Sequence, residues 1–226
     1  MILAAGRGER MRPLTDNMPK PLLSVAGKPL IQHHIERLAQ AGIRELVINL
    51  AWKGAMIREA LGTGARFGVE IAYSDEGERA LETGGGIFNA LPLLGAQPFL
   101  IVNGDVWTDY PFGRLVARFE STTLGQVRSD LAHLVLVPNP PQHARGDFTL
   151  AEGRVLERGA DTATYSGIAV YSREFFAGCP TGPFRLLDPL TAAINAGRLS
   201  GERYEGRWFD IGTPQRLAEL DELLRS

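Results

Sequence analysis

The chain alternates short apolar runs with amphipathic stretches, and this alternation restricts its fold more than any other sequence feature. The apolar runs have the length of β-strands and lie at Met1–Ala5, Glu45–Leu50, Val69–Tyr73, Phe99–Asn103, Ala132–Val137, Thr164–Tyr171 and Arg207–Ile211. Between the early runs, the apolar spacing of helices is found at Pro29–Ala41, Trp52–Leu61 and Thr83–Leu94. Near-continuous apolar strands that alternate with helices are typical of parallel sheets whose two faces are both covered. We therefore predict an α/β fold that is Rossmann-like, with a mixed, mainly parallel sheet and helices on both faces.

The second half of the chain departs from this alternation. After about residue 130 the apolar runs follow one another more closely, which favours hairpins and predicts a small antiparallel subregion. The segment Pro138–Asp147 contains too many prolines for a central strand and is predicted to be an exposed loop. Near the end, one apolar helix face is predicted from Leu217, Leu220, Leu223 and Leu224. No linker or repeat interrupts the sequence, so we predict one domain over residues 1–226.

Composition excludes several classes of partner and site. The net charge of -2 at pH 7 argues against a general nucleic-acid or membrane surface, because both require a basic face. A single cysteine, Cys179, excludes a disulfide framework and a multi-cysteine metal site. No apolar run approaches the roughly 18 residues of a membrane span, and the opening run is too short for the core of a signal peptide. We predict a cytoplasmic protein that is a monomer or weak dimer and binds neither nucleic acid nor membranes.

The first apolar run leads directly into a loop rich in glycine and positive charge, "LAAGRGERMRPLTDNMPKPLL" (residues 3–23). In open parallel sheets, ligands bind beyond the carboxyl ends of the strands, where this loop begins. Glycines let backbone N–H groups approach a ligand closely, and basic side chains suit phosphate oxygens. The loop supplies Gly6, Gly8, Arg7, Arg10 and Lys20. The P-loop spacing is missing, and Met11 stands where the dinucleotide fingerprint requires its third glycine. The loop therefore predicts a polyphosphate ligand, with a nucleotide as the expected one.

The same loop carries a complete sequence signature, G-x-G-x-R-M-x-P-x-T-x-x-x-P-K. Its fixed positions are Gly6, Gly8, Arg10, Met11, Pro13, Thr15, Pro19 and Lys20. With this signature the chain resembles the sugar-1-phosphate nucleotidylyltransferases. Three further motifs are similar to that family in the same order: "NGD" (Asn103–Asp105), "YSGIAVY" (Tyr165–Tyr171) and "WFDIGTP" (Trp208–Pro214). The resemblance extends over most of the chain and implies the nucleotide-diphospho-sugar transferase fold, with the antiparallel subregion binding the sugar.

The resemblance implies a reaction in which an NTP and a sugar 1-phosphate give an NDP-sugar and pyrophosphate. Positioning and electrostatics would dominate catalysis, because the attacking phosphate oxygen is already anionic. By resemblance, Arg10 clamps the leaving phosphates and Lys20 contacts the reacting ones. Asp105 and Asp210 would hold Mg²⁺, the implied cofactor. The implied nucleotide-binding residues are Leu3, Ala4, Ala5, Gly6, Arg7, Gly8, Glu82 and Gly85. The implied sugar-binding residues are Asn103, Gly146, Glu157, Gly167 and Arg145.

Two shorter motifs narrow the resemblance to one branch. "LETGGG" (Leu81–Gly86) and "RGDF" (Arg145–Phe148) most resemble the N-acetylmuramate-1-phosphate uridylyltransferases. This branch implies UTP as the donor, N-acetylmuramate 1-phosphate as the acceptor and a role in peptidoglycan recycling. A basic side chain or backbone N–H donors should meet the lactyl carboxylate of that sugar, and Arg145 is the candidate side chain. Two alternatives stay open: a guanylyltransferase or other NTP transferase for mannose, heptose or another hexose 1-phosphate, and a sugar-nucleotide sensor without catalysis.

Overall fold

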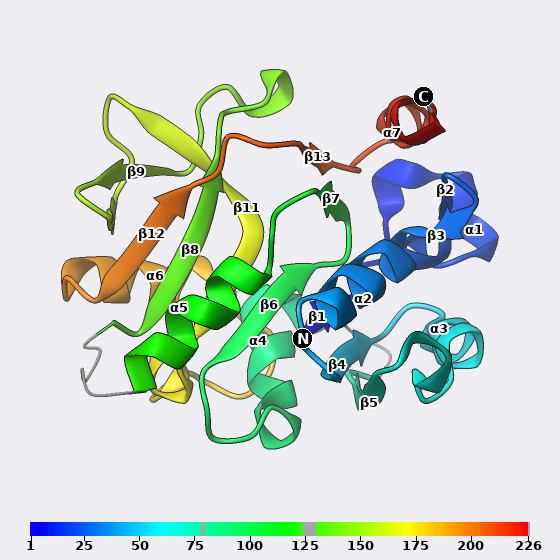
Figure 1. The fold of residues 1–226 in the computed structure, drawn as a ribbon, viewed down its shortest axis with the longest axis horizontal. Helices are drawn as coiled ribbons and strands as arrows, with labels where there is room; N and C mark the ends of the chain where they lie inside the picture. Colours follow the sequence, from blue (N-terminus) through cyan, green and yellow to red (C-terminus); the bar gives the residue numbers. More distant parts are fainter. Residues whose placement is uncertain (78–79, 124–129, 226) are drawn as a thin grey trace.

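A nine-stranded mixed sheet lies at the centre of the molecule, in the strand order β5-β4-β1-β6-β11-β8-β12-β10-β9 (Figure 1). The computed structural model describes residues 1–77, 80–123 and 130–225. The strands of this sheet are β1 (Ile2–Leu3), β4 (Glu45–Leu50), β5 (Glu70–Asp75), β6 (Phe99–Asn103), β8 (Ala132–Val137), β9 (Phe148–Ala151), β10 (Arg154–Leu156), β11 (Thr162–Tyr171) and β12 (Leu199–Arg203). Two small antiparallel ribbons pair β2 (Ser24–Val25) with β3 (Lys28–Pro29) and β7 (Val106–Thr108) with β13 (Trp208–Asp210).

The strands β5, β4, β1 and β6 run parallel to one another, and their order fixes where a ligand can bind. Ile2 of β1 is paired with Ile48 of β4 on one side and with Val102 of β6 on the other. From β1 the chain passes to β4 and β5, and it then returns to β6 on the opposite side of β1. Ligands of open α/β sheets bind beyond the carboxyl ends of the strands at such a reversal of order. The ends of β1 and β6 are therefore expected to border the functional cleft.

The other half of the sheet is largely antiparallel. Strand β11 lies antiparallel between β6 and β8, and β9 and β10 form a hairpin. One pair here is parallel, because β12 lies beside β8 in the same direction. The segment Pro138–Asp147 contains no strand and only a short 3-10 turn at Pro141–His143. The antiparallel subregion and the exposed loop predicted from the sequence are both present.

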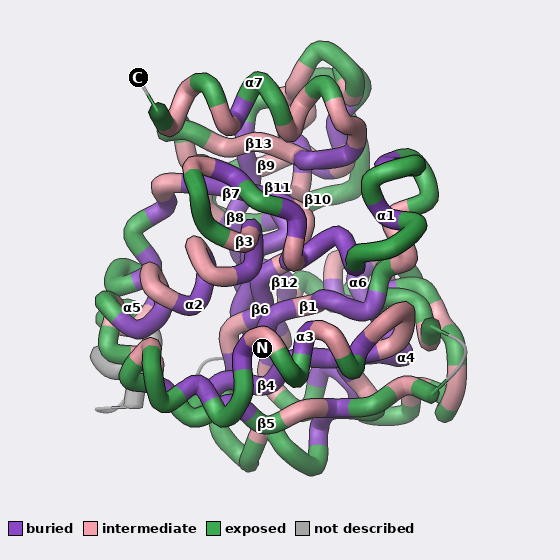
Figure 2. Tube along the Cα trace, turned by 90° about the vertical axis from the view of Figure 1, so that its right-hand side faces the viewer, coloured by how far each residue is buried: buried purple, intermediate pink, exposed green. Residues whose placement is uncertain are grey.

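Helices cover both faces of the sheet. One face carries α2 (Leu30–Gln40), α3 (Gly54–Leu61) and α5 (Gly113–Thr123), and the other carries α4 (Glu82–Ala90) and α6 (Leu187–Asn195). The consecutive β6 residues Ile101 and Val102 belong to the two different buried clusters, as expected where side chains of a strand alternate between faces. Figure 2 shows the central strands buried and the outer helix turns exposed. The predicted α/β fold with helices on both faces is confirmed. In the described ranges, no helix is both long and apolar enough to cross a membrane.

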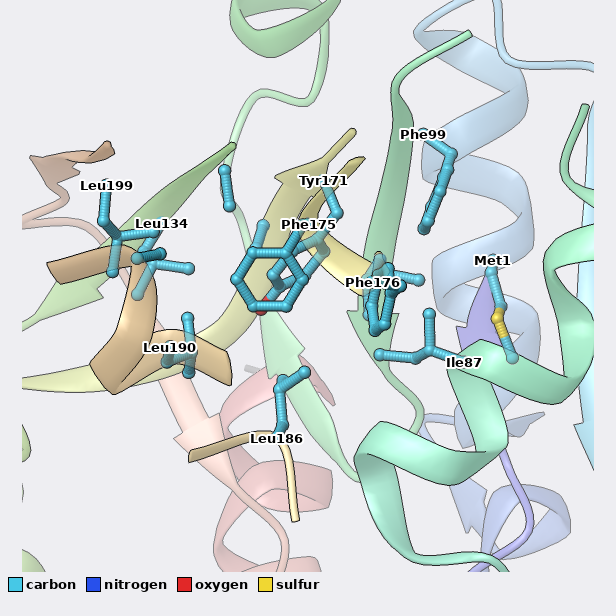
Figure 3. Packing of buried hydrophobic residues seen from close by; sticks show 14 of the residues in the cluster. Met1, Ile87, Phe99, Leu134, Tyr171, Phe175, Phe176, Leu186, Leu190 and Leu199 are labelled. Carbon is cyan, nitrogen blue, oxygen red and sulfur yellow. The ribbon is translucent and has the colours of Figure 1, made fainter. Parts of the chain in front are cut away.

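The face that α4 and α6 cover has an aromatic centre (Figure 3). The Phe175 ring centroid lies 4.7 Å from that of Tyr171 and 4.9 Å from that of Phe176, which is the spacing that aromatic pairs prefer. Ile87 of α4 and Leu190 of α6 belong to the same cluster. This packing anchors α4, the helix whose first residues border the site.

A third, smaller cluster joins the two ends of the chain. It includes Met11 from the opening loop, Trp107 from β7, Ile211 after β13 and Leu220 from α7 (Pro214–Arg225). In Figure 1 the red α7 lies beside the blue segment that holds β2, β3 and the short α1 (Leu14–Asn17). The opening loop and the end of β13 are consequently brought to the same edge of the sheet.

Candidate active site

A cleft of about 430 Å³ lies beyond the carboxyl ends of β1 and β6, at the position that the strand order indicates. The described residues that line it are Leu3, Ala4, Ala5, Gly6, Gly8, Glu9, Arg10, Met11, Lys20, Pro21, Asn49, Glu76, Ala80, Glu82, Thr83, Asn103, Gly104, Asp105 and Gly212. They come from the opening loop, the ends of β4, β5 and β6, the start of α4 and the turn after β13. Separate segments of the sequence therefore meet around one space.

The opening loop is held in shape by its own signature residues. Gly8 has a φ of 68°, and a Cβ atom built there would lie 3.1 Å from the Thr15 side chain. The Thr15 hydroxyl and the Met11 N–H both donate to the Gly8 carbonyl, at 2.8 and 2.9 Å. Met11 is buried, so it anchors the loop while its neighbour Arg10 remains at the cleft. Several fixed positions of the signature thus have a structural role beside any chemical one.

Lys20 and Asp105 form an ion pair inside the cleft. Lys20 Nζ lies 2.9 Å from Asp105 Oδ2, and the Lys20 side chain is only 8% exposed, against 45% for Asp105. A buried cation requires a charged or hydrogen-bonded partner, and this carboxylate supplies it. The pair therefore fixes a positive charge at the end of β6, where the carboxylate also faces the cleft.

A second carboxylate, Asp210, is brought to this place by the β7–β13 ribbon. Asp210 is paired with Val106, and the Ile211 N–H donates to the Asp105 carbonyl at 2.9 Å. Asp210 Oδ2 lies 2.6 Å from Nη1 of Arg216, at the start of α7. A Cβ atom built on the intervening Gly212 would lie 3.0 Å from Arg216 Nη1 and 3.3 Å from both Arg10 Nη1 and Asp210 Oδ2. Two carboxylates and three cations, Arg10, Lys20 and Arg216, are thus gathered at this end of the cleft.

A neutral histidine supports the ribbon from behind. His34 of α2 is buried, and its Nε2 donates to the Val106 carbonyl at 2.7 Å. Burial lowers the pKa of His34 to about 4, because desolvation disfavours the charged imidazolium. The imidazole is therefore uncharged near neutral pH and adds no positive charge behind Asp105.

The opposite end of the cleft lies between β4, β5 and the start of α4. Glu82 lines it with a φ of 56°, and its carboxylate lies 3.7 Å from Arg185. Asn49 and Glu76, from the end of β4 and the residue after β5, line it as well. Sequence reasoning missed both residues, since an isolated polar residue at a strand end carries no motif. The one available signal is Asn49 itself, an amide inside an otherwise apolar run.

Comparison with known proteins identifies the family. Residues 1–142 match the nucleotidyl transferase family. The chain belongs to this family. An N-acetylmuramate α-1-phosphate uridylyltransferase of Neisseria meningitidis is 52% identical, over 99% of this chain and 96% of that protein. A protein of the same name from Caulobacter vibrioides is 38% identical, over 95% and 92%. A mannose-1-phosphate guanylyltransferase of Mycobacterium tuberculosis is 31% identical, over 95% of this chain and 61% of that protein.

Solved structures show the same fold. A Bacillus anthracis structure provisionally named a glucose-1-phosphate thymidylyltransferase superimposes with a TM-score of 0.85 at 22% identity, covering 100% of this chain and 94% of that one. HddC of Yersinia pseudotuberculosis, in complex with GMP-PN, gives a TM-score of 0.76 at 21% identity, covering 99% and 97%. The family resemblance, the enzyme class of nucleotidyltransferases and the fold that the resemblance implies are confirmed.

The structure of this nucleotidyltransferase places most of the predicted site residues at the cleft, but not all of them. The cleft contains Leu3, Ala4, Ala5, Gly6, Gly8, Arg10, Lys20, Glu82, Asn103 and Asp105, with Asp210 beside Gly212. Arg7 is turned toward Trp52, with its guanidinium 3.7 Å from the indole centroid. Gly85 packs on the Gly182 carbonyl, which leaves no room for a side chain. Neither is among the described residues that line the cleft.

The predicted sugar-side residues are spread more widely. Gly167 lies in a bulge of β11 with a φ of 78°, and a Cβ atom there would lie 2.6 Å from Asn103 Cγ. Gly146 is buried against Asn139, whereas Arg145 and Glu157 are exposed. Of these five, only Asn103 is among the described residues that line the cleft. Gly167 therefore contacts the cleft indirectly, because it packs against the Asn103 side chain, which lines the cleft.

This contact makes Gly167→Ala a specific test. The added methyl group must displace the Asn103 side chain, so we expect kcat/KM to fall about tenfold to hundredfold in a pyrophosphate-release assay. Gly153→Ala is the matched control, because Gly153 has a φ of 75° but open space around its Cα. Both variants should lose similar thermal stability through backbone strain. Equal kcat/KM in Gly167→Ala and Gly153→Ala would show that the position of the Asn103 side chain does not affect turnover.

Proposed function

We propose that this enzyme transfers UMP from UTP to N-acetylmuramate 1-phosphate, giving UDP-N-acetylmuramate and pyrophosphate, in peptidoglycan recycling. The geometric observation that carries the proposal is the convergence of the opening loop, the Lys20–Asp105 pair and Asp210 at one end of a cleft. The choice of substrates is supported by the names and high coverage of the 52% and 38% identical relatives. We further propose that residues 1–226 act as one domain in the cytoplasm, as a monomer or weak dimer.

The reaction requires little proton transfer. An oxygen of the sugar phosphate attacks the α-phosphorus of UTP, and a P–O bond forms as the bond to the bridging oxygen of pyrophosphate breaks. The electron pair of the broken bond leaves with pyrophosphate, and the attacking oxygen carries no proton that must be removed. The protein must instead bring together two polyanions and stabilise charge on the leaving group.

The residues of the cleft suit these two tasks. We assign the leaving phosphates to Arg10 and the reacting phosphates to Lys20, whose positive charge is held in place by Asp105. The nucleotide is assigned to Leu3, Ala4, Ala5, Gly6, Gly8 and Glu82 of the cleft, and to Arg7 and Gly85 beside it, outside the described lining. The acceptor sugar is assigned to Asn103 of the cleft and to four residues outside its described lining, Gly146, Glu157, Gly167 and Arg145.

The two aspartates fit a hard divalent cation. The Oδ1 atoms of Asp105 and Asp210 accept no hydrogen bond from any residue that the structure describes. Among those residues, no group of three or more His, Cys, Asp or Glu side chains could hold a metal on its own. Mg²⁺ matches this sparse set, since it commonly binds one or two carboxylates beside phosphates and waters. When bound, Mg²⁺ would neutralise phosphate charge as a Lewis acid.

The test is pyrophosphate release from a matrix of substrates. Each of four NTPs is combined with the 1-phosphates of N-acetylmuramate, N-acetylglucosamine, glucose, mannose and heptose, with and without Mg²⁺. We expect pyrophosphate release to be fastest by far with UTP, N-acetylmuramate 1-phosphate and Mg²⁺. A preference for GTP above tenfold would favour the guanylyltransferase alternative, which the 31% identical relative supports. No turnover with any pair would favour a sensor.

The proposed role of Arg145 gives a separate prediction. Arg145→Ala should raise KM for N-acetylmuramate 1-phosphate about tenfold through loss of a charge-assisted hydrogen bond. KM for N-acetylglucosamine 1-phosphate should stay unchanged, because that sugar lacks the lactyl carboxylate. Arg158→Ala removes another exposed arginine and serves as the control. A similar rise for both sugars would remove Arg145 from the site.

A further inference from the structure

Two polar side chains connect the walls of the cleft at the end remote from Lys20 and Asp105. Asn49 is 4% exposed, and its Oδ1 accepts a hydrogen bond of 2.7 Å from the Ala4 N–H. Its Nδ2 donates to Glu76 Oε1 at 2.6 Å. The other carboxylate oxygen, Glu76 Oε2, accepts from the Leu81 N–H at 2.7 Å. The chain Ala4–Asn49–Glu76–Leu81 thus runs from the end of β1 to the residue before α4.

The surrounding structure leaves room for this network. Gly86 lies so close to Glu76 Oε1 that a side chain there would displace the carboxylate, and a Cβ atom would lie 3.1 Å from Asn49 Nδ2. The Glu76 N–H donates to the Leu50 carbonyl at 2.8 Å, which fixes the backbone beside Asn49. Asn49 and Glu76 both line the cleft. Such a hydrogen-bonded network, buried at Asn49 and half-buried at Glu76, rigidifies the segments that it joins.

We propose that Asn49 and Glu76 are positioning residues that set the distance between the two nucleotide-binding segments, Leu3–Gly8 and the start of α4. This inference rests on the proposed function, because it assumes that the nucleoside lies between those segments. The network reaches Ala4 and Leu81 but makes no hydrogen bond to Lys20, Arg10 or Asp105 in the part of the chain that the structure describes. Its loss should therefore weaken nucleotide binding and spare the phosphate chemistry.

Donor and acceptor chemistry allows a reciprocal test. In Glu76→Gln, one end of the new amide is an N–H₂ group, which must face either the Asn49 Nδ2 donor or the Leu81 N–H donor. In Asn49→Asp, the Nδ2 donor is replaced by a carboxylate oxygen, which faces the Glu76 carboxylate and cannot donate to it. In the double variant, the new amide at position 76 can donate to the new carboxylate at position 49, while the N–H groups of Ala4 and Leu81 keep their acceptors. All three hydrogen bonds are restored with the central one reversed in direction.

The experiment measures UTP binding by calorimetry in the absence of sugar phosphate, together with kcat and both KM values. Each single variant should weaken UTP binding and raise its KM about tenfold to hundredfold, as expected for a buried unpaired group. In the single variants, kcat and the KM for the sugar phosphate should stay within about threefold of wild type. The double variant should bind UTP with an affinity within about threefold of wild type. Ser74→Ala is the control: it removes a hydrogen bond of 3.1 Å between β5 and Asn89 of α4 outside the network, and should leave UTP binding unchanged.

The outcomes separate the inference from the proposed function. Single variants that bind UTP as wild type does would overturn the inference. A double variant as weak as the singles would also overturn it, because the carboxylate at position 76 would then contact the ligand directly. Thermal unfolding of all variants checks that they are folded at the assay temperature. A wild-type protein that binds another nucleotide but not UTP would contradict the proposed substrate, and the same variants are then tested on that nucleotide.

Discussion

Lys20→Met is expected to lower kcat/KM by about a thousandfold, the magnitude typical of removing one preorganised charge from a transition state. Methionine preserves most of the length and packing of the buried lysine stem. The ammonium group at the end of β6 is lost, and Asp105 Oδ2 loses its partner at 2.9 Å. Phosphoryl transfer depends on such fixed positive charge, because negative charge moves to the leaving pyrophosphate. Steady-state pyrophosphate release with the best substrate pair measures the effect.

Lys28→Met is the matched control for this change. Lys28 forms an ion pair with Glu36 at 2.7 Å, but 46% of its side chain is exposed and it lies in the β2–β3 ribbon, outside the cleft lining. Exposed pairs contribute little to stability, so this variant should retain wild-type kinetics. If Lys20→Met kept activity within about threefold of Lys28→Met, the buried ammonium would be structural.

The sequence predicted well those parts of the fold that local patterns determine. The runs Glu45–Leu50, Phe99–Asn103 and Ala132–Val137 are strands with the predicted bounds. Apart from the exposed Glu45, the residues of these strands are buried or half-buried, so each has a continuous apolar run with clear ends. The strands β9, β10 and β12 were not predicted individually, because they are short and partly exposed. Their pairing depends on a sheet order that brings distant segments together.

In the cleft, too, the sequence predicted the residues of a continuous motif and missed those that only the fold brings together. The opening loop was predicted because its signature is continuous, and most of its named residues line the cleft. Asn49 and Glu76 were missed because they lie 27 residues apart and meet only through the parallel pairing of β4 and β5. Arg216 was missed for a similar reason, since only the turn into α7 brings it to Asp210. Gly85 matched a family motif, yet its lack of a side chain serves packing on Gly182.

On the proposal that Asp105 holds Mg²⁺, Asp105→Asn is expected to lower kcat by about three orders of magnitude, because a bound metal contributes several kcal/mol of charge stabilisation to the transition state. The amide keeps the shape of the side chain but not its charge. The Mg²⁺ concentration that gives half-maximal activity should rise. The affinity for Mn²⁺, measured by electron paramagnetic resonance, should fall in parallel. Asp16→Asn is the control, because Asp16 pairs with Arg12 at 3.2 Å on the exposed surface of α1.

Asp105 contacts Lys20, so a loss of activity alone would leave two explanations for its role. If Asp105 serves only to orient Lys20, adding Asp105→Asn to Lys20→Met should cost nothing further, since the oriented group is already gone. If Asp105 also binds the metal, the double variant should be at least about tenfold less active than Lys20→Met alone, and should bind Mn²⁺ more weakly. Equal activity and equal Mn²⁺ binding in the single Lys20 variant and the double variant would contradict the metal assignment while leaving the lysine assignment intact.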